Sequence, residues 1–129
     1  MLLSALPPVE ILVCTTCIRE GMDPEATRRG AVLHEALAAA GLPENVVLKP
    51  VECLSNCSQG CSVVLRGGAT RWTYVYGNLA EDAVETVVDG TRRYAATSDG
   101  LVPWRERPEH FRKNCVARIP PLDAPIPSL

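Results

Sequence analysis

The chain has 129 residues and a formal net charge of −2, with 47% hydrophobic and 22% charged residues. This balance is typical of one globular domain, and no apolar run reaches the ~18 residues that a membrane-spanning helix needs. The small negative charge and the aromatic content of 5% argue against a nucleic-acid-binding protein. The opening residues, MLLSALPP, have no basic flank and no long apolar stretch, so we expect a cytoplasmic protein and not a secreted one.

The first half of the chain predicts a strand, a helix and a second strand. Residues 9–13 are rich in β-branched side chains and indicate a buried strand that runs into the first cysteine. An Asp-Pro-Glu sequence at residues 23–25 is typical of a helix start, and an apolar face continues this helix to about residue 40. Residues 46–52 then predict a second strand, which leads directly to another cysteine.

The second half predicts a hairpin followed by a helix. Residues 62–65 and 72–76 indicate two strands, and a Gly-Gly pair between them indicates the turn. Asn78 with Glu81 three residues later resembles a capping box, from which a helix would run to about residue 98. The whole order predicts an α/β fold, β-α-β-β-β-α, with a mixed sheet, helices on both faces and an extended C-terminal tail.

The composition changes near residue 100. Residues 101–129 contain six of the eleven prolines and have a net charge of +2, whereas residues 1–100 have a net charge of −4. We therefore expect a domain at residues 1–100 that holds the chemistry, and a Pro-rich basic tail at residues 101–129. Because a disordered segment would favour a composition without Trp, Phe and Ile, we expect the tail to dock on the domain or on a partner subunit.

Cysteines follow both strands of the predicted β-α-β unit. Cys14 and Cys17 follow the first strand, and Cys53, Cys57 and Cys61 follow the second. The two strands of such a unit are parallel, so their carboxyl ends meet at one edge of the sheet and five thiols converge there. Thiolates in this number suit zinc, iron–sulfur clusters or copper(I), and a reducing compartment favours metal or redox chemistry over disulfides.

The residues by themselves leave several kinds of site open. A structural zinc site needs four ligands, which Cys14, Cys17, Cys53 and Cys57 can supply. A thioredoxin-type redox pair would use Cys14 and Cys17 but would leave the other three cysteines without a role. A [4Fe–4S] cluster normally shows C-x2-C-x2-C spacing, which the chain lacks. No GxSxG or HExxH motif is present, so we expect no catalytic activity.

The order of elements and the cysteine pattern together resemble the thioredoxin-like [2Fe–2S] ferredoxins. The resemblance runs from Val9 to about Ala96 and includes CLSNC at residues 53–57, Gly60, and YVYG at residues 74–77. The whole chain also resembles a bacterial family described as predicted metal-binding proteins, whose members are often found near cobalamin-synthesis genes. The resemblance to the ferredoxins implies a thioredoxin-like fold and a cluster bound by four cysteines.

The ligands that the resemblance implies can be assigned residue by residue. Cys53 and Cys57 match the C-x3-C pair of the ferredoxins, and Cys14 matches their first cysteine. The second cysteine of the ferredoxins usually lies farther from the first than Cys17 does here, which leaves Cys17 and Cys61 as candidates for the fourth ligand. We assign Cys17, because it lies on the same loop as Cys14, with Cys61 as the alternative. The second cysteine segment, residues 53–61, also contains polar side chains that are expected to donate hydrogen bonds to the cluster sulfurs. These side chains are Ser55, Asn56 and Ser58.

The function that this resemblance implies is one-electron transfer. A [2Fe–2S] cluster would be the cofactor, and a redox protein would be the partner. The resembling ferredoxins form homodimers, so we also expect a homodimer, and we expect neither nucleic acid nor membrane as a partner. The alternatives are a module that binds zinc or another thiophilic metal, and a CxxC thiol–disulfide protein.

Overall fold

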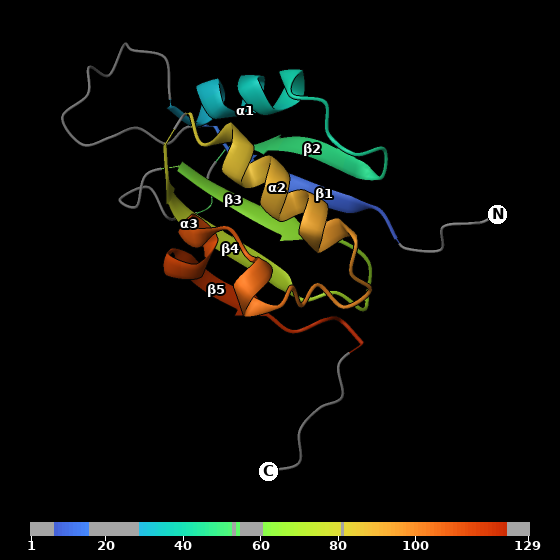
Figure 1. The fold of residues 1–129 in the computed structure, drawn as a ribbon. Helices are drawn as coiled ribbons and strands as arrows, with labels where there is room; N and C mark the ends of the chain where they lie inside the picture. The colour runs from blue at the N-terminus through green and yellow to red at the C-terminus, as the bar shows by residue number, and fades with distance from the viewer. Residues whose placement is uncertain (1–6, 16–28, 53, 55–60, 81, 124–129) are drawn as a thin grey trace.

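The computed structural model describes residues 7–15, 29–52, 54, 61–80 and 82–123. Five strands and three α-helices, with one short 3₁₀ helix, occupy these residues (Figure 1). In chain order the elements are β1 (Val9–Cys14), α1 (Arg29–Ala39), β2 (Val46–Val51), β3 (Cys61–Arg66), β4 (Thr73–Leu79), α2 (Val84–Ala95), η2 (Trp104–Glu106), α3 (Glu109–Lys113) and β5 (Cys115–Ile119). No helix among the described residues combines the length and the apolar character needed to cross a membrane.

The five strands form one mixed sheet in the order β2-β1-β3-β4-β5. β1 pairs with β2 in parallel, from Val9 opposite Val46 to Cys14 opposite Val51, and the other three pairings are antiparallel. The parallel pair follows from the crossover through α1, which returns the chain to the edge where β1 began. β1 lies next to the centre of the sheet and is buried at five of its six positions, consistent with its sequence of β-branched and apolar residues.

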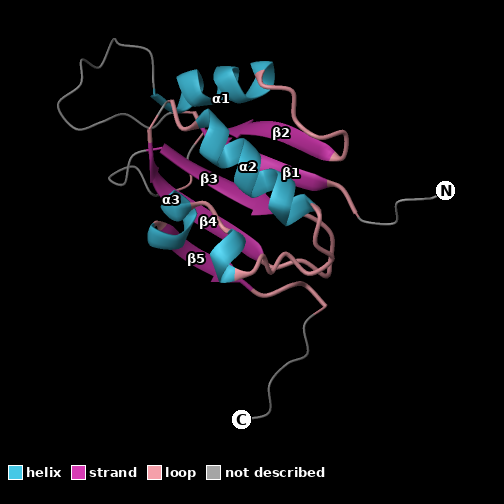
Figure 2. Ribbon diagram, in the orientation of Figure 1, coloured by secondary structure: helices cyan, strands magenta, loops and turns pink. Residues whose placement is uncertain are grey.

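The helices lie on one face of the sheet, whereas the sequence predicts helices on both faces. α1 contacts α2, and α2 contacts α3, which helices on opposite sides of a sheet could not do (Figure 2). Leu33 and Leu37 of α1 belong to the same buried cluster as Val87 of α2 and Ile11 of β1. An apolar stripe shows that a helix is buried but does not show on which face, and contacts between the helices decide this.

The start of α2 also differs from the prediction. Asn78 lies inside β4 with a φ of 54°, and α2 begins only at Val84, with no side-chain hydrogen bond at its N-cap. The Asn78 side chain instead donates from Nδ2 to Oδ1 of Asn114 at 3.1 Å. The prediction of a capping box at Asn78 is therefore wrong. Pairing with β3 extends β4 to Leu79, beyond residue 76, where the sequence predicts the strand to end. Glu81 lies outside the described residues, as does the predicted helix start at residues 23–25.

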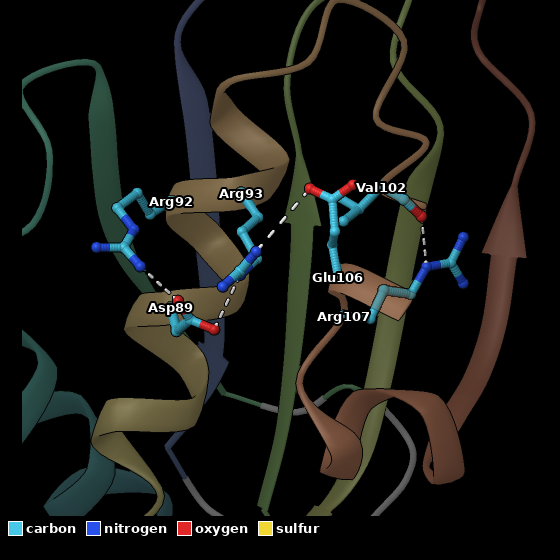
Figure 3. A network of polar contacts seen from close by, with 6 residues as sticks. All are labelled: Asp89, Arg92, Arg93, Val102, Glu106 and Arg107. Atoms are coloured by element: carbon cyan, nitrogen blue, oxygen red, sulfur yellow. Dashed lines mark hydrogen bonds and ion pairs between the residues drawn. The ribbon is translucent and has the colours of Figure 1, made fainter. Parts of the chain in front are cut away.

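Residues beyond 100 contribute a strand and a core residue. β5 pairs with the outer edge of β4, and the Phe111 side chain of α3 is 2% exposed. The Phe111 ring stacks on Tyr76 with 3.8 Å between the ring centroids. Polar contacts lie over the same region, since Arg93 of α2 reaches Glu106 at 4.0 Å and Arg107 donates to the carbonyl oxygen of Val102 at 2.7 Å (Figure 3). Exposed ion pairs contribute only about 0–1 kcal/mol each, so the aromatic contact dominates here.

Gly90 shows how closely α2 and α3 approach each other. A Cβ atom at this position would lie 2.1 Å from Cε2 of Phe111. Gly90→Ala should therefore lower the free energy of unfolding by about 1–3 kcal/mol, although Gly→Ala at an unobstructed helix position raises it. Urea denaturation measures this, and the matched double variant Gly90→Ala with Phe111→Leu should show a smaller loss relative to Phe111→Leu alone. A Gly90→Ala variant more stable than the wild type would contradict the packing.

Candidate metal centre

Two segments contain the clustered cysteines, residues 14–17 and 53–61. Three strand termini that flank these cysteine segments meet at one edge of the sheet. β1 ends at Cys14, opposite Val51, the last residue of β2. β3 is antiparallel to β1, with Val13 opposite Val63, so the start of β3 lies toward the same edge (Figure 1). The first residue of β3 is Cys61. The convergence expected from the β-α-β order is thus present for the backbone before the first cysteine segment and on both sides of the second.

The two described cysteines at this edge are buried. Cys14 is 2% exposed and Cys61 is fully buried, and both belong to the apolar core cluster. Cys61 lies opposite Leu79 of β4, and the register shifts between Cys61 and Val63. β1 and β3 are neighbouring strands, and paired strands lie about 4.8 Å apart. Cys14 and Cys61 therefore lie on adjacent strands, and both are buried away from water.

Hydrogen bonds fasten the end of β1 to the end of β2. The Thr15 backbone N–H donates to the carbonyl oxygen of Val51 at 2.8 Å, and the Thr15 hydroxyl donates to the same oxygen at 3.2 Å. The Cys14 thiol donates to the carbonyl oxygen of Glu52 at 3.6 Å. The chain therefore reaches Cys53 from a point that is bonded to Cys14 and Thr15. Leu54, one residue farther, packs against the core cluster.

The other predicted site residues lie outside the part of the chain that the structure describes. They are the predicted ligands Cys17, Cys53 and Cys57 and the polar residues Ser55, Asn56 and Ser58. Within the described ranges, no group of three His, Cys, Asp or Glu side chains is arranged to hold a metal ion. The structure thus brings Cys14 and Cys61 to one edge, and the ligand set inferred from the sequence remains a prediction.

Cys115, the sixth cysteine, lies in β5 and is separated from β3 by β4. The residue is exposed and pairs with Tyr76, and its thiol donates to the carbonyl oxygen of Ala117 at 3.6 Å. Partial burial of the thiol raises the pKa of Cys115. Because the thiolate is the form that binds metals, a raised pKa and a separate strand make Cys115 a suitable control residue for experiments on the other five.

Sequence reasoning missed two polar residues that the structure makes prominent. The Thr15 hydroxyl links the ends of β1 and β2, and the position of Thr15 directly after Cys14 is the sequence signal that could have indicated this role. Arg71, between β3 and β4, is 1% exposed, and its guanidinium donates to four backbone carbonyl oxygens on three separate parts of the chain. Nothing in the sequence around Arg71 indicates this role, because its acceptors are main-chain atoms.

Comparisons with known proteins agree with this architecture. A solved structure of a thioredoxin-like [2Fe–2S] ferredoxin from Aquifex aeolicus is similar, with a TM-score of 0.56 and 16% sequence identity. The match covers 92% of this chain and 98% of the ferredoxin, and it confirms the predicted α/β, thioredoxin-like fold. Comparison with curated proteins gives no match. A family model described as "Protein of unknown function (DUF1636)" matches residues 11–121, and the chain therefore belongs to that family.

Proposed function

We propose that the protein is a one-electron carrier that binds a [2Fe–2S] cluster through cysteine thiolates. The observation that carries this proposal is the convergence of the β1 and β2 termini with the start of β3 at one edge of the sheet. Each of the two cysteine segments leaves the sheet from this edge. The similarity to a thioredoxin-like ferredoxin supports the same proposal, although at 16% identity it concerns the fold.

The residues at this edge suit such a cluster chemically. Soft thiolate ligands suit thiophilic centres, iron–sulfur clusters among them, and the cluster itself would supply reversible one-electron redox chemistry. We assign Cys14, Cys17, Cys53 and Cys57 as its ligands, with Cys61 as the alternative to Cys17. Burial of Cys14 and Cys61 supports this assignment, because a dry region protects bound thiolates from water and oxidants.

We also infer the partners from this role. A carrier without catalysis of its own must receive its electron from one redox protein and give it to another. A cytoplasmic location would keep the thiolates reduced before the cluster is inserted. We propose in addition that the protein is a homodimer, which sedimentation analysis of the purified protein tests directly.

The metal content of the purified protein tests the proposal. We expect protein prepared without oxygen, or reconstituted with iron and sulfide, to be red-brown and to contain iron and acid-labile sulfide in equal amounts. One-electron reduction should produce an EPR signal of a mixed-valence [2Fe–2S] centre. A colourless protein that retains zinc after reconstitution would favour the zinc alternative, and a colourless metal-free protein with a titratable disulfide would favour the thiol–disulfide alternative.

A further inference from the structure

Thr15 makes two hydrogen bonds to one acceptor at the edge where the cysteine segments leave the sheet. Its backbone N–H and its hydroxyl both donate to the carbonyl oxygen of Val51, at 2.8 and 3.2 Å. A carbonyl oxygen has two lone pairs and can accept both. The backbone bond continues the β1–β2 ladder and is available to any residue except proline, whereas the second bond requires a side-chain hydroxyl.

The neighbouring bond from Cys14 behaves differently when the cysteine becomes a ligand. The Cys14 thiol donates its proton to the carbonyl oxygen of Glu52 at 3.6 Å. Metals bind the thiolate, which has no proton to donate. The two bonds from Thr15 do not involve this thiol, and they therefore persist after ligation.

We propose that the Thr15 hydroxyl is a positioning group for the metal centre, and this inference rests on the proposed function. By holding the end of β2 beside β1, the hydroxyl fixes the point from which the chain enters the second cysteine segment. The chain then enters the second cysteine segment from a point bonded to Thr15, since Glu52 is the last residue before that segment. Preorganised ligands release a metal centre slowly, because a ligand that detaches stays close to its binding position and rebinds.

Thr15→Val tests the proposal, because valine keeps the shape and the β-branching of threonine and removes only the hydroxyl. Thr15→Ser keeps the hydroxyl. Thr70→Val is the matched control, since the Thr70 hydroxyl also donates to a backbone carbonyl oxygen, that of Ser98 at 2.8 Å. Thr70 lies in the turn after β3, at the opposite end of the sheet from Cys61. Two quantities are measured. The first is the rate at which the visible absorption of the cluster bleaches when an iron chelator is added under anaerobic conditions, and the second is the melting temperature of each metal-free variant.

We expect Thr15→Val to lose the cluster about three- to tenfold faster than the wild type, the effect of one lost hydrogen bond. Thr15→Ser and Thr70→Val should lose it at nearly the wild-type rate, and the metal-free melting temperatures of the two valine variants should be similar. Failure of Thr15→Val alone to take up a cluster would support the proposal more strongly. Equal rates of cluster loss for Thr15→Val and the wild type would overturn the proposal. A Thr15→Ser or Thr70→Val variant that loses the cluster as fast as Thr15→Val would also overturn it. A wild-type protein that binds no cluster would refute the proposed function, and this inference with it.

Discussion

Replacement of Cys53 or Cys57 by Ser is expected to abolish the [2Fe–2S] cluster. Serine removes the soft sulfur donor and keeps nearly the same size, so the loss reports ligation and not packing. Both cysteines follow β2, whose end is bonded to Cys14 and Thr15, and together they match the C-x3-C pair of the resembling ferredoxins. The measurement is iron and sulfide content together with the EPR spectrum after reduction. Cys115→Ser is the matched control and should retain the full signal, because Cys115 lies on β5.

The same measurement decides between the two candidates for the fourth ligand. We expect Cys17→Ala to destroy the cluster spectrum and Cys61→Ala to leave it nearly unchanged. Cys61 is fully buried in the core, so its substitution will lower stability whether or not it binds iron. For this reason the optical spectrum per bound iron, and not the yield of protein, is the quantity to compare. A normal EPR signal in both Cys53→Ser and Cys57→Ser would contradict the ligand assignment, and the reverse result for Cys17 and Cys61 would reassign the fourth ligand.

Arg71→Met is expected to lower the free energy of unfolding by about 3 kcal/mol or more. The Arg71 guanidinium donates to carbonyl oxygens on three separate parts of the chain: the segment before β1, the turn after β3 and the end of α2. These acceptors belong to Pro7 at 2.8 Å, Gly67 at 3.5 Å, Ala95 at 3.2 Å and Thr97 at 2.9 Å. Methionine would fill most of the volume but would remove these donors, and a buried carbonyl group left unsatisfied, as that of Ala95 would be, costs about 1–3 kcal/mol. The bonds to the other three carbonyl groups are partly buried, so the loss of each costs less.

Urea denaturation measures this effect, with Arg92→Met as the control. Arg92 lies on α2 with a side chain 67% exposed and pairs with Asp89 three residues earlier. An exposed pair of this kind contributes about 0.2–0.5 kcal/mol, so the control should change little. If Arg71→Met and Arg92→Met lowered stability equally, the Arg71 hydrogen bonds would not stabilise the fold. The cysteine edge lies at the other end of the strands, so we expect cluster binding by folded Arg71→Met to be unaffected.

The sequence by itself determined the parts of this protein that depend on neighbouring residues. Alternating apolar and β-branched residues located four strands, and the β-α-β order required β1 and β2 to be parallel. From this alone we expect Cys14 and Cys53 near one edge of the sheet, and the ends of β1 and β2 meet there. The similarity of the fold to a thioredoxin-like ferredoxin confirms the architecture inferred in this way.

Tertiary contacts decided the features that depend on residues far apart in the chain. The burial of α1 and α2 on a common face depends on contact between the two helices, and the fifth strand depends on β4 offering an unpaired edge. Pairing with β3 keeps Asn78 in a strand although its sequence favours a helix cap. Arg71 and Thr15 act through backbone carbonyl oxygens, which every residue carries, so side-chain patterns cannot reveal their acceptors.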